Sequence, residues 1–197
     1  MTAEDHTLPE RPEGFARAII ADVLTGSRAV LAVAVMLAIA SSRFDWAAVF
    51  VTFAWITDFF DGRLARSTVH PTRLGDWDLR IDITLGIGIL IGLGWSGWVP
   101  WTAVLVPMLV LGTLAIAMHN PSPTMLLLAY IYLVFFWVLI AERPLGGWLP
   151  FAALPLIATL DWGRFTRVIL PVFFKGIAAL ARGERTPDTK PVLDEWV

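Results

Sequence analysis

The sequence predicts an all-α, polytopic membrane protein with six transmembrane helices and an N-terminal interfacial helix. Hydrophobic residues make up 57% of the 197-residue chain, and the mean hydropathy is +0.69, whereas a soluble domain is closer to half apolar. The apolar residues are also gathered into runs of roughly 15–20 residues, which is the length that spans a hydrocarbon core.

The expected elements follow in chain order. Residues 1–14 are expected to form a disordered, polar cytoplasmic tail. Residues 15–24 are expected to form the interfacial helix, because Arg17 and Asp22 interrupt its apolar residues. After a turn at 25–27, spans are expected at 28–42, 46–60 with the helix continuing to 66, 77–93, 102–118, 124–141 and 148–160. Residues 161–182 either extend the sixth helix or lie on the membrane surface, and 183–197 form a polar tail. One membrane domain therefore covers residues 15–182.

The basic residues predict the orientation of these spans. An even number of spans places both termini on one side of the membrane. Of the 15 lysines and arginines, only Arg43 and Arg143 then fall on the opposite side. Because basic residues favour the cytoplasmic side, we expect a multi-pass protein of the cell membrane with both termini in the cytoplasm.

The composition also limits the chemistry. The chain has no cysteine, which excludes disulfides, thiol catalysis and thiolate-bound zinc. Its histidines, His6, His70 and His119, are scattered, so we expect no histidine-rich metal site. We expect no nucleic-acid partner.

Acidic residues are concentrated between the second and third spans. Asp58 and Asp61 lie three residues apart near the end of the second span, and Asp78 and Asp82 lie four apart at the start of the third. Residues at these spacings share one helix face, and a short loop makes the two helices antiparallel neighbours. The four carboxylates are therefore expected to converge. Because charged groups are costly in a membrane, they usually serve a function there.

This arrangement indicates a site for hard cations. Clustered carboxylates repel one another unless a cation neutralises them, and a set of carboxylate ligands selects Mg²⁺, Mn²⁺ or Ca²⁺. Four of them can hold two ions, an arrangement suited to phosphoryl or diphosphate chemistry. Gly62 leaves room for a ligand, and Arg66 offers donors to a phosphate. Alternatively, Asp76 and Asp78 only cap a helix, which would not account for Asp58, Asp61 and Asp82.

The stretch resembles the signature of the CDP-alcohol phosphatidyltransferases, Asp-x2-Asp-Gly-x2-Ala-Arg-x8-Gly-x3-Asp-x3-Asp. The residues that match in type and spacing are Asp58, Asp61, Gly62, Ala65, Arg66 and Gly75, and Asp78 and Asp82 keep their mutual spacing. Only two residues, where the family has three, separate Gly75 from Asp78. Residues 24–28, Leu-Thr-Gly-Ser-Arg, resemble the family's Leu-Thr-x2-Arg before the first span.

The resemblance implies an enzyme of phospholipid synthesis. It would transfer a phosphatidyl or related group from a CDP-linked donor, such as CDP-diacylglycerol, to the hydroxyl of an acceptor alcohol and release CMP. Glycerol 3-phosphate is the first acceptor expected, followed by inositol phosphate and other polar alcohols. The resemblance also implies Mg²⁺ or Mn²⁺ (two ions), contact with membrane lipids and a homodimer.

The resemblance also implies roles for particular residues. The metal ligands would be Asp58, Asp61, Asp78 and Asp82, with Asp82 as the general base as well. The CDP moiety would be bound by Asp61, Gly62, Ala65, Arg66, Gly75 and Asp78.

Three arginines are candidates for holding a phosphate on the acceptor, namely Arg164, Arg167 and Arg28. For the first two, ordinary cytoplasmic charge or contact with anionic lipids is the favoured explanation. Two alternative functions remain: a small cation-binding transporter, and a relative of the family that has lost its activity.

Overall fold

The computed structural model describes residues 12–66 and 78–184, apart from the side chains of 12–18, 21, 62, 64–66, 78 and 79. Across the described ranges every regular element is helical, which confirms the all-α prediction. The elements are α1 (Pro12–Ala40), α2 (Phe44–Arg66), α3 (Asp78–Trp95), α4 (Trp101–Met118), α5 (Ser122–Glu142), α6 (Trp148–Leu160), α7 (Trp162–Arg164), a π-helix (Phe165–Ile169) and α8 (Leu170–Ala181).

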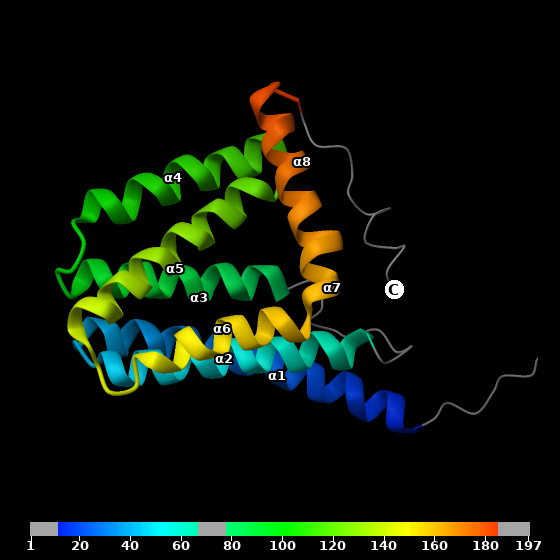
Figure 1. Cartoon of the computed structure of the whole chain (residues 1–197), viewed down its shortest axis with the longest axis horizontal. Helices are drawn as coiled ribbons and strands as arrows, with labels where there is room; N and C mark the ends of the chain where they lie inside the picture. Colours follow the sequence, from blue (N-terminus) through cyan, green and yellow to red (C-terminus); the bar gives the residue numbers. More distant parts are fainter. Residues whose placement is uncertain (1–11, 67–77, 185–197) are drawn as a thin grey trace, which may run out of the picture.

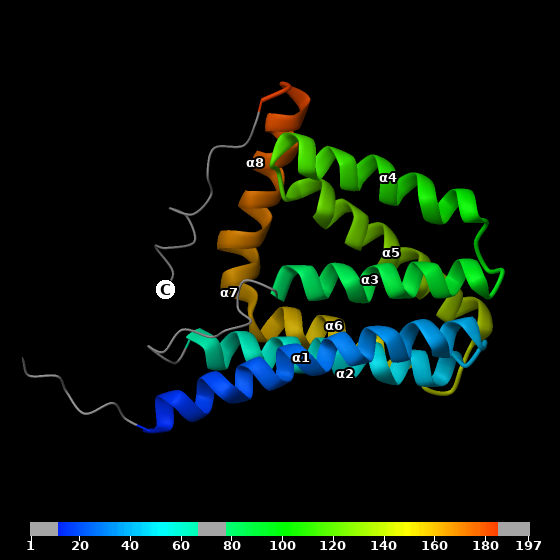
Figure 2. The ribbon, with the colours of Figure 1, turned by 180° about the vertical axis from the view of Figure 1, so that it is seen from behind.

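The centre of the fold is the packing of α1 against α2 and α3 (Figures 1 and 2). Two glycines of α3 bring its backbone against α1. A Cβ atom on Gly88 would lie 2.8 Å from the Ala32 carbonyl oxygen, and one on Gly92 would lie 2.9 Å from the Met36 carbonyl oxygen. Small residues allow such close approach between membrane helices. Any larger residue at either position would push α3 away from α1.

The other long helices surround this centre. α6 packs along α2, α5 packs on α3, and α4 packs on α5 (Figure 1). α4 is the most peripheral, since Val104 is the one residue buried along its length. Its apolar exterior, which includes Leu109 and Ile116, suits contact with lipid.

The separate N-terminal interfacial helix is not found. α1 is continuous from Pro12 to Ala40, so the predicted turn at residues 25–27 is wrong. The reason is that the hydroxyl groups of this segment donate hydrogen bonds from within a continuous helix. The Ser27 hydroxyl donates to the Leu24 carbonyl oxygen at 2.7 Å, and the Thr25 hydroxyl donates to Asp61 of α2.

The segment after α6 does not extend the sixth helix. Instead, α7, the π-helix and α8 turn away and cross the end of the bundle at which α2 ends and α3 begins (Figures 1 and 2). We call this the acidic end. The alternative in which residues 161–182 extend the sixth helix is therefore wrong, and a position on the membrane surface stays a prediction.

A polar contact fixes α8 to the turn between α4 and α5. Asn120, in this turn, and Ser122, the first residue of α5, are both buried. The Asn120 amide donates to the Gly176 carbonyl oxygen at 2.9 Å, and its own oxygen accepts from the Ser122 backbone N–H at 2.9 Å. The Ser122 hydroxyl donates to the Phe173 carbonyl oxygen at 3.2 Å. These bonds hold α8 across the acidic end.

We predict that Gly176→Ala destabilises the protein by about 1–3 kcal/mol, the usual cost of overpacking. The added Cβ would overlap the Ser122 hydroxyl and lie 2.8 Å from the Asn120 side-chain oxygen. Thermal unfolding in detergent measures the effect. Gly112→Ala is the matched control, because an added Cβ there meets nothing within 4 Å. Equal unfolding temperatures for both variants would contradict the proposed contact.

Three of the described helical segments are long and apolar enough to cross a membrane, namely Asp22–Ala40, Trp101–Met118 and Ser122–Glu142, while α6 is apolar but shorter. α2 and α3 are interrupted by charged residues at their acidic ends, among them Asp58, Asp61 and Asp82. The helices are those of a polytopic membrane protein, and the count of six spans remains a prediction.

Candidate active site

Three carboxylates meet around one guanidinium at the acidic end. Asp58 and Asp61 come from α2, Asp82 comes from the start of α3, and Arg28 comes from α1. Arg28 Nη1 donates to Asp58 Oδ1 and to Asp82 Oδ1 at 3.0 Å. Its Nη2 lies 3.7 Å from Asp61 Oδ2. The predicted convergence of these three aspartates is therefore found, with an arginine at its centre.

The members of this group differ in burial. The Arg28 side chain is 0% exposed and that of Asp61 is 4% exposed. The side chains of Asp58 and Asp82 are 42% and 34% exposed. Arg28 and Asp61 thus form the inner part of the group, while Asp58 and Asp82 remain accessible to a ligand.

Thr25 completes the inner part. It lies three residues before Arg28, on the same face of α1, and its hydroxyl donates to Asp61 Oδ2 at 2.9 Å. The Leu-Thr-x2-Arg resemblance therefore marks the two residues of α1 that bind the α2 carboxylates. Their partners are 36 and 30 residues further along the chain, so the local sequence alone did not identify them.

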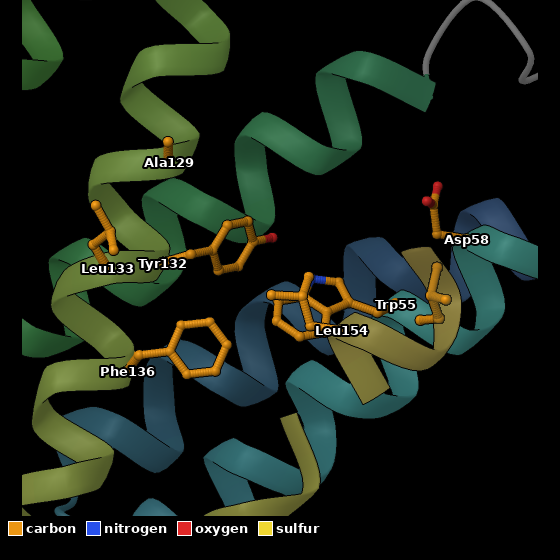
Figure 3. Close-up of a pocket in the computed structure, with 8 residues that line it drawn as sticks. Trp55, Asp58, Ala129, Tyr132, Leu133, Phe136 and Leu154 are labelled. Carbon is orange, nitrogen blue, oxygen red and sulfur yellow. The ribbon is translucent and has the colours of Figure 1, made fainter. Parts of the chain in front are cut away.

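Two cavities adjoin the site. A cavity of about 380 Å³ is lined by Asp58, Phe59, Asp82, Leu154, Ile157, Ala158, Asp161, Arg164, Phe165 and Ile169. We call it the polar cavity. A second cavity, of about 490 Å³, lies between α2, α5 and α6 and is lined by Trp55, Asp58, Ala129, Tyr132, Leu133, Phe136, Leu154 and Ile157 (Figure 3). We call it the apolar cavity. The cavities share Asp58, Leu154 and Ile157, so they are neighbours.

The candidate acceptor arginines have different surroundings. Arg164 lines the polar cavity, and its Nη1 lies 3.8 Å from Asp161 Oδ2. Arg167 is exposed on the π-helix and is not part of that lining. Arg28 is buried behind Asp58 and Asp82, a position that does not favour a direct contact with the acceptor.

The remaining predicted site residues lie outside the description. This applies to Gly75 as a whole, to the surroundings of Gly62 and to the side chains of Ala65, Arg66 and Asp78. The spacing between Gly75 and Asp78 likewise falls outside the described residues. Trp55 and Tyr132 were not predicted as site residues, because apolar runs give no signal for which residues line a cavity.

The donor chemistry of the group fits a hard divalent cation. Its acidic ligands are all carboxylates, and three carboxylates with one guanidinium keep a net negative charge. Among the described residues, no three acidic or histidine side chains meet at a common point suited to a metal ion. The Arg28 guanidinium stands between the aspartates instead, and the fourth carboxylate, that of Asp78, lies outside the description.

The fold and site together define a helical membrane protein with a carboxylate site at one end of its bundle. A comparison with protein-family models matches residues 18–159 to CDP-alcohol phosphatidyltransferase. The chain therefore belongs to the CDP-alcohol phosphatidyltransferase family, as the sequence resemblance predicted. No curated protein and no solved structure gave a significant match.

Membership of this family makes the chain a membrane transferase of phospholipid biosynthesis that moves a phospho-alcohol group from a CDP-alcohol to an acceptor. The match includes α2 to α5 and nearly all of α6. It ends before α7, so Arg164, the π-helix and α8 lie beyond it.

Proposed function

We propose that the protein transfers a phosphatidyl group from CDP-diacylglycerol, or a similar CDP-linked lipid, to the hydroxyl group of a small polar alcohol, with release of CMP. The observation that carries this proposal is the position of Asp58, a residue of the carboxylate group that lines both cavities. A donor with a charged diphosphate and apolar chains needs a carboxylate site that adjoins one polar and one apolar space.

In this proposal, Asp58, Asp61, Asp78 and Asp82 hold divalent cations, Mg²⁺ or Mn²⁺, and two ions are expected. When bound, such ions neutralise the diphosphate and make its phosphorus more electrophilic. The CDP moiety is bound by Asp61, Gly62, Ala65, Arg66, Gly75 and Asp78.

The protein's own residues then orient the reactants. The acceptor hydroxyl enters the polar cavity and attacks the phosphorus next to the lipid, and the bond from that phosphorus to the CMP oxygen breaks. Asp82 accepts the hydroxyl proton, a role supported by its position on the polar cavity. Arg28 keeps Asp58 and Asp82 in place from the buried side.

The acceptor is expected to carry a phosphate. Arg164 lies on the wall of the polar cavity, and an arginine is well suited to hold a phosphate. We therefore favour Arg164 over Arg167 and Arg28 for this role. Glycerol 3-phosphate is the first acceptor to test, followed by inositol phosphate.

In the membrane, we propose that the acidic end faces the cytoplasm, because the basic residues Arg164, Arg167 and Lys175 also lie there. We further propose a homodimer, as the family resemblance implies.

The deciding experiment measures CMP release by the purified full chain in detergent, with CDP-diacylglycerol, Mg²⁺ or Mn²⁺, and a panel of acceptors. We expect turnover with at least one phosphorylated alcohol and its loss on addition of EDTA. No turnover with any acceptor would contradict the proposal and favour an inactive relative. Cation flux in vesicles without turnover would instead favour a transporter.

A further inference from the structure

The apolar cavity has a single hydroxyl group on its wall, that of Tyr132. The other polar side chains there are Trp55 and Asp58. Figure 3 shows the Tyr132 ring extending from α5 with its hydroxyl at the far end, on the side of the cavity where Asp58 lies. The ring is supported by Trp55, whose ring centroid is 5.1 Å away in an edge-to-face arrangement. The hydroxyl is thus held in a defined direction.

The proton of this hydroxyl remains available for a ligand. The Trp55 side chain is hydrogen-bonded to Tyr132, but an indole group is only a donor, so it cannot accept the hydroxyl proton. Within residues 12–66 and 78–184, no protein acceptor for the Tyr132 O–H is found. Tyr132 is half-buried, and binding pockets commonly combine an apolar wall with a few polar groups of this kind.

The other tyrosine provides a direct contrast. The chain has two tyrosines, and the hydroxyl of Tyr130 donates to the Ala103 carbonyl oxygen at 2.9 Å, which connects α5 to α4. Tyr130 therefore has a structural hydrogen bond inside the protein. Tyr132, two residues later on the same helix, presents the same group to a cavity.

The place of Tyr132 indicates which part of a ligand it meets. The cavity that it lines shares Asp58, Leu154 and Ile157 with the polar cavity. A lipid-linked donor whose diphosphate lies at the carboxylates would direct its chains into the apolar cavity. The part of that donor next to Tyr132 is then the junction between phosphate and acyl chains, which is rich in oxygen acceptors.

We infer that the Tyr132 hydroxyl binds the lipid part of the donor, by donating a hydrogen bond to an oxygen at the junction between its phosphate and its acyl chains. This inference rests on the proposed function. It makes Tyr132 a residue that distinguishes a lipid-linked donor from the nucleotide alone.

The test compares Tyr132→Phe, which removes only the hydroxyl, with the matched control Tyr130→Phe. Each full-length protein is titrated in detergent with CDP-diacylglycerol and, separately, with CDP, and dissociation constants are obtained from ligand-dependent thermal shifts. One hydrogen bond corresponds to a roughly three- to tenfold change in affinity. We expect Tyr132→Phe to bind CDP-diacylglycerol that much more weakly and CDP as tightly as the wild type. Tyr130→Phe should bind both ligands normally, even if it unfolds at a lower temperature.

The possible outcomes separate this inference from the proposed function. Unchanged lipid affinity in Tyr132→Phe would overturn the inference, and so would an equal loss of affinity for CDP and the lipid. A wild-type protein that binds CDP but not CDP-diacylglycerol would overturn it as well. If Tyr132→Phe selectively loses affinity for the lipid while the wild type releases no CMP, the proposed transfer reaction is refuted but the Tyr132 contact is supported.

Discussion

Replacing Asp82 by asparagine is expected to lower the rate of CMP release by at least roughly a hundredfold, the lower end of the contribution of a general base. Asparagine keeps the shape of the side chain and an oxygen that can accept the Arg28 hydrogen bond, which is 3.0 Å long in the native protein. It cannot take a proton from the acceptor hydroxyl. The measurement is CMP release at saturating donor and acceptor, with the unfolding temperature recorded in parallel.

The control for Asp82→Asn is the same substitution at Asp45. That aspartate lies in the first turn of α2, at the other end of the bundle, where its Oδ1 accepts from the Gly146 backbone N–H at 2.8 Å. We expect Asp45→Asn to retain the wild-type turnover number. Substantial turnover in Asp82→Asn would remove the assignment of Asp82 as the base.

Replacing Arg28 by methionine is expected to destabilise the protein by about 3–5 kcal/mol, the cost of removing one partner from a buried ion pair. The methionine would fill part of the space but leave the buried Asp61 and its neighbours facing one another without the guanidinium. Denaturation in detergent, followed by tryptophan fluorescence, measures the loss. Lysine at this position should restore part of the stability, because it keeps the charge but not the two-pronged geometry.

A second measurement distinguishes charge from packing. If the methionine variant is unstable because the carboxylates repel one another, Mg²⁺ or Mn²⁺ should raise its unfolding temperature more than that of the wild type. Arg43→Met serves as the control, since Arg43 is exposed at the opposite end of the bundle. Equal stability of Arg28→Met and Arg43→Met would contradict the role of Arg28 as the counter-ion of the aspartates.

Much of the fold was predictable because it depends on local pattern. The apolar runs and the turn residues between them predicted the bounds of α2 to α6 to within a few residues. The course of the chain after Leu160 was left open, since its apolar and basic residues suit either an extension of the sixth helix or a helix on the membrane surface. Its course depends on the contact of α8 with Asn120 and Ser122, more than 50 residues earlier in the chain.

The candidate site was predictable in part for the same reason. The spacing of Asp58 and Asp61, together with a short connection to α3, predicted that Asp82 would meet them. Arg28 was named only as a candidate for the acceptor site, and its contact with the aspartates was not predicted, because a sequence does not reveal which side of α1 is buried. The error at Thr25–Ser27 has a similar origin, since hydroxyl-rich segments suit a helix cap as well as an interhelical hydrogen bond.

The two glycines of α3 have a consequence for how such a protein can change during evolution. Gly88 and Gly92 allow α3 to pack directly against the backbone of α1. A larger side chain at either position would separate the two helices and change the distance between Arg28 and Asp82. The walls of both cavities across from these helices are built from ordinary side chains such as Leu133, Leu154 and Phe165, whose volumes can vary by single methylene groups. Substitutions on α5, α6 and the π-helix are therefore expected to change the preferred lipid length or acceptor size. The residues of the α1–α3 contact are expected to stay the same.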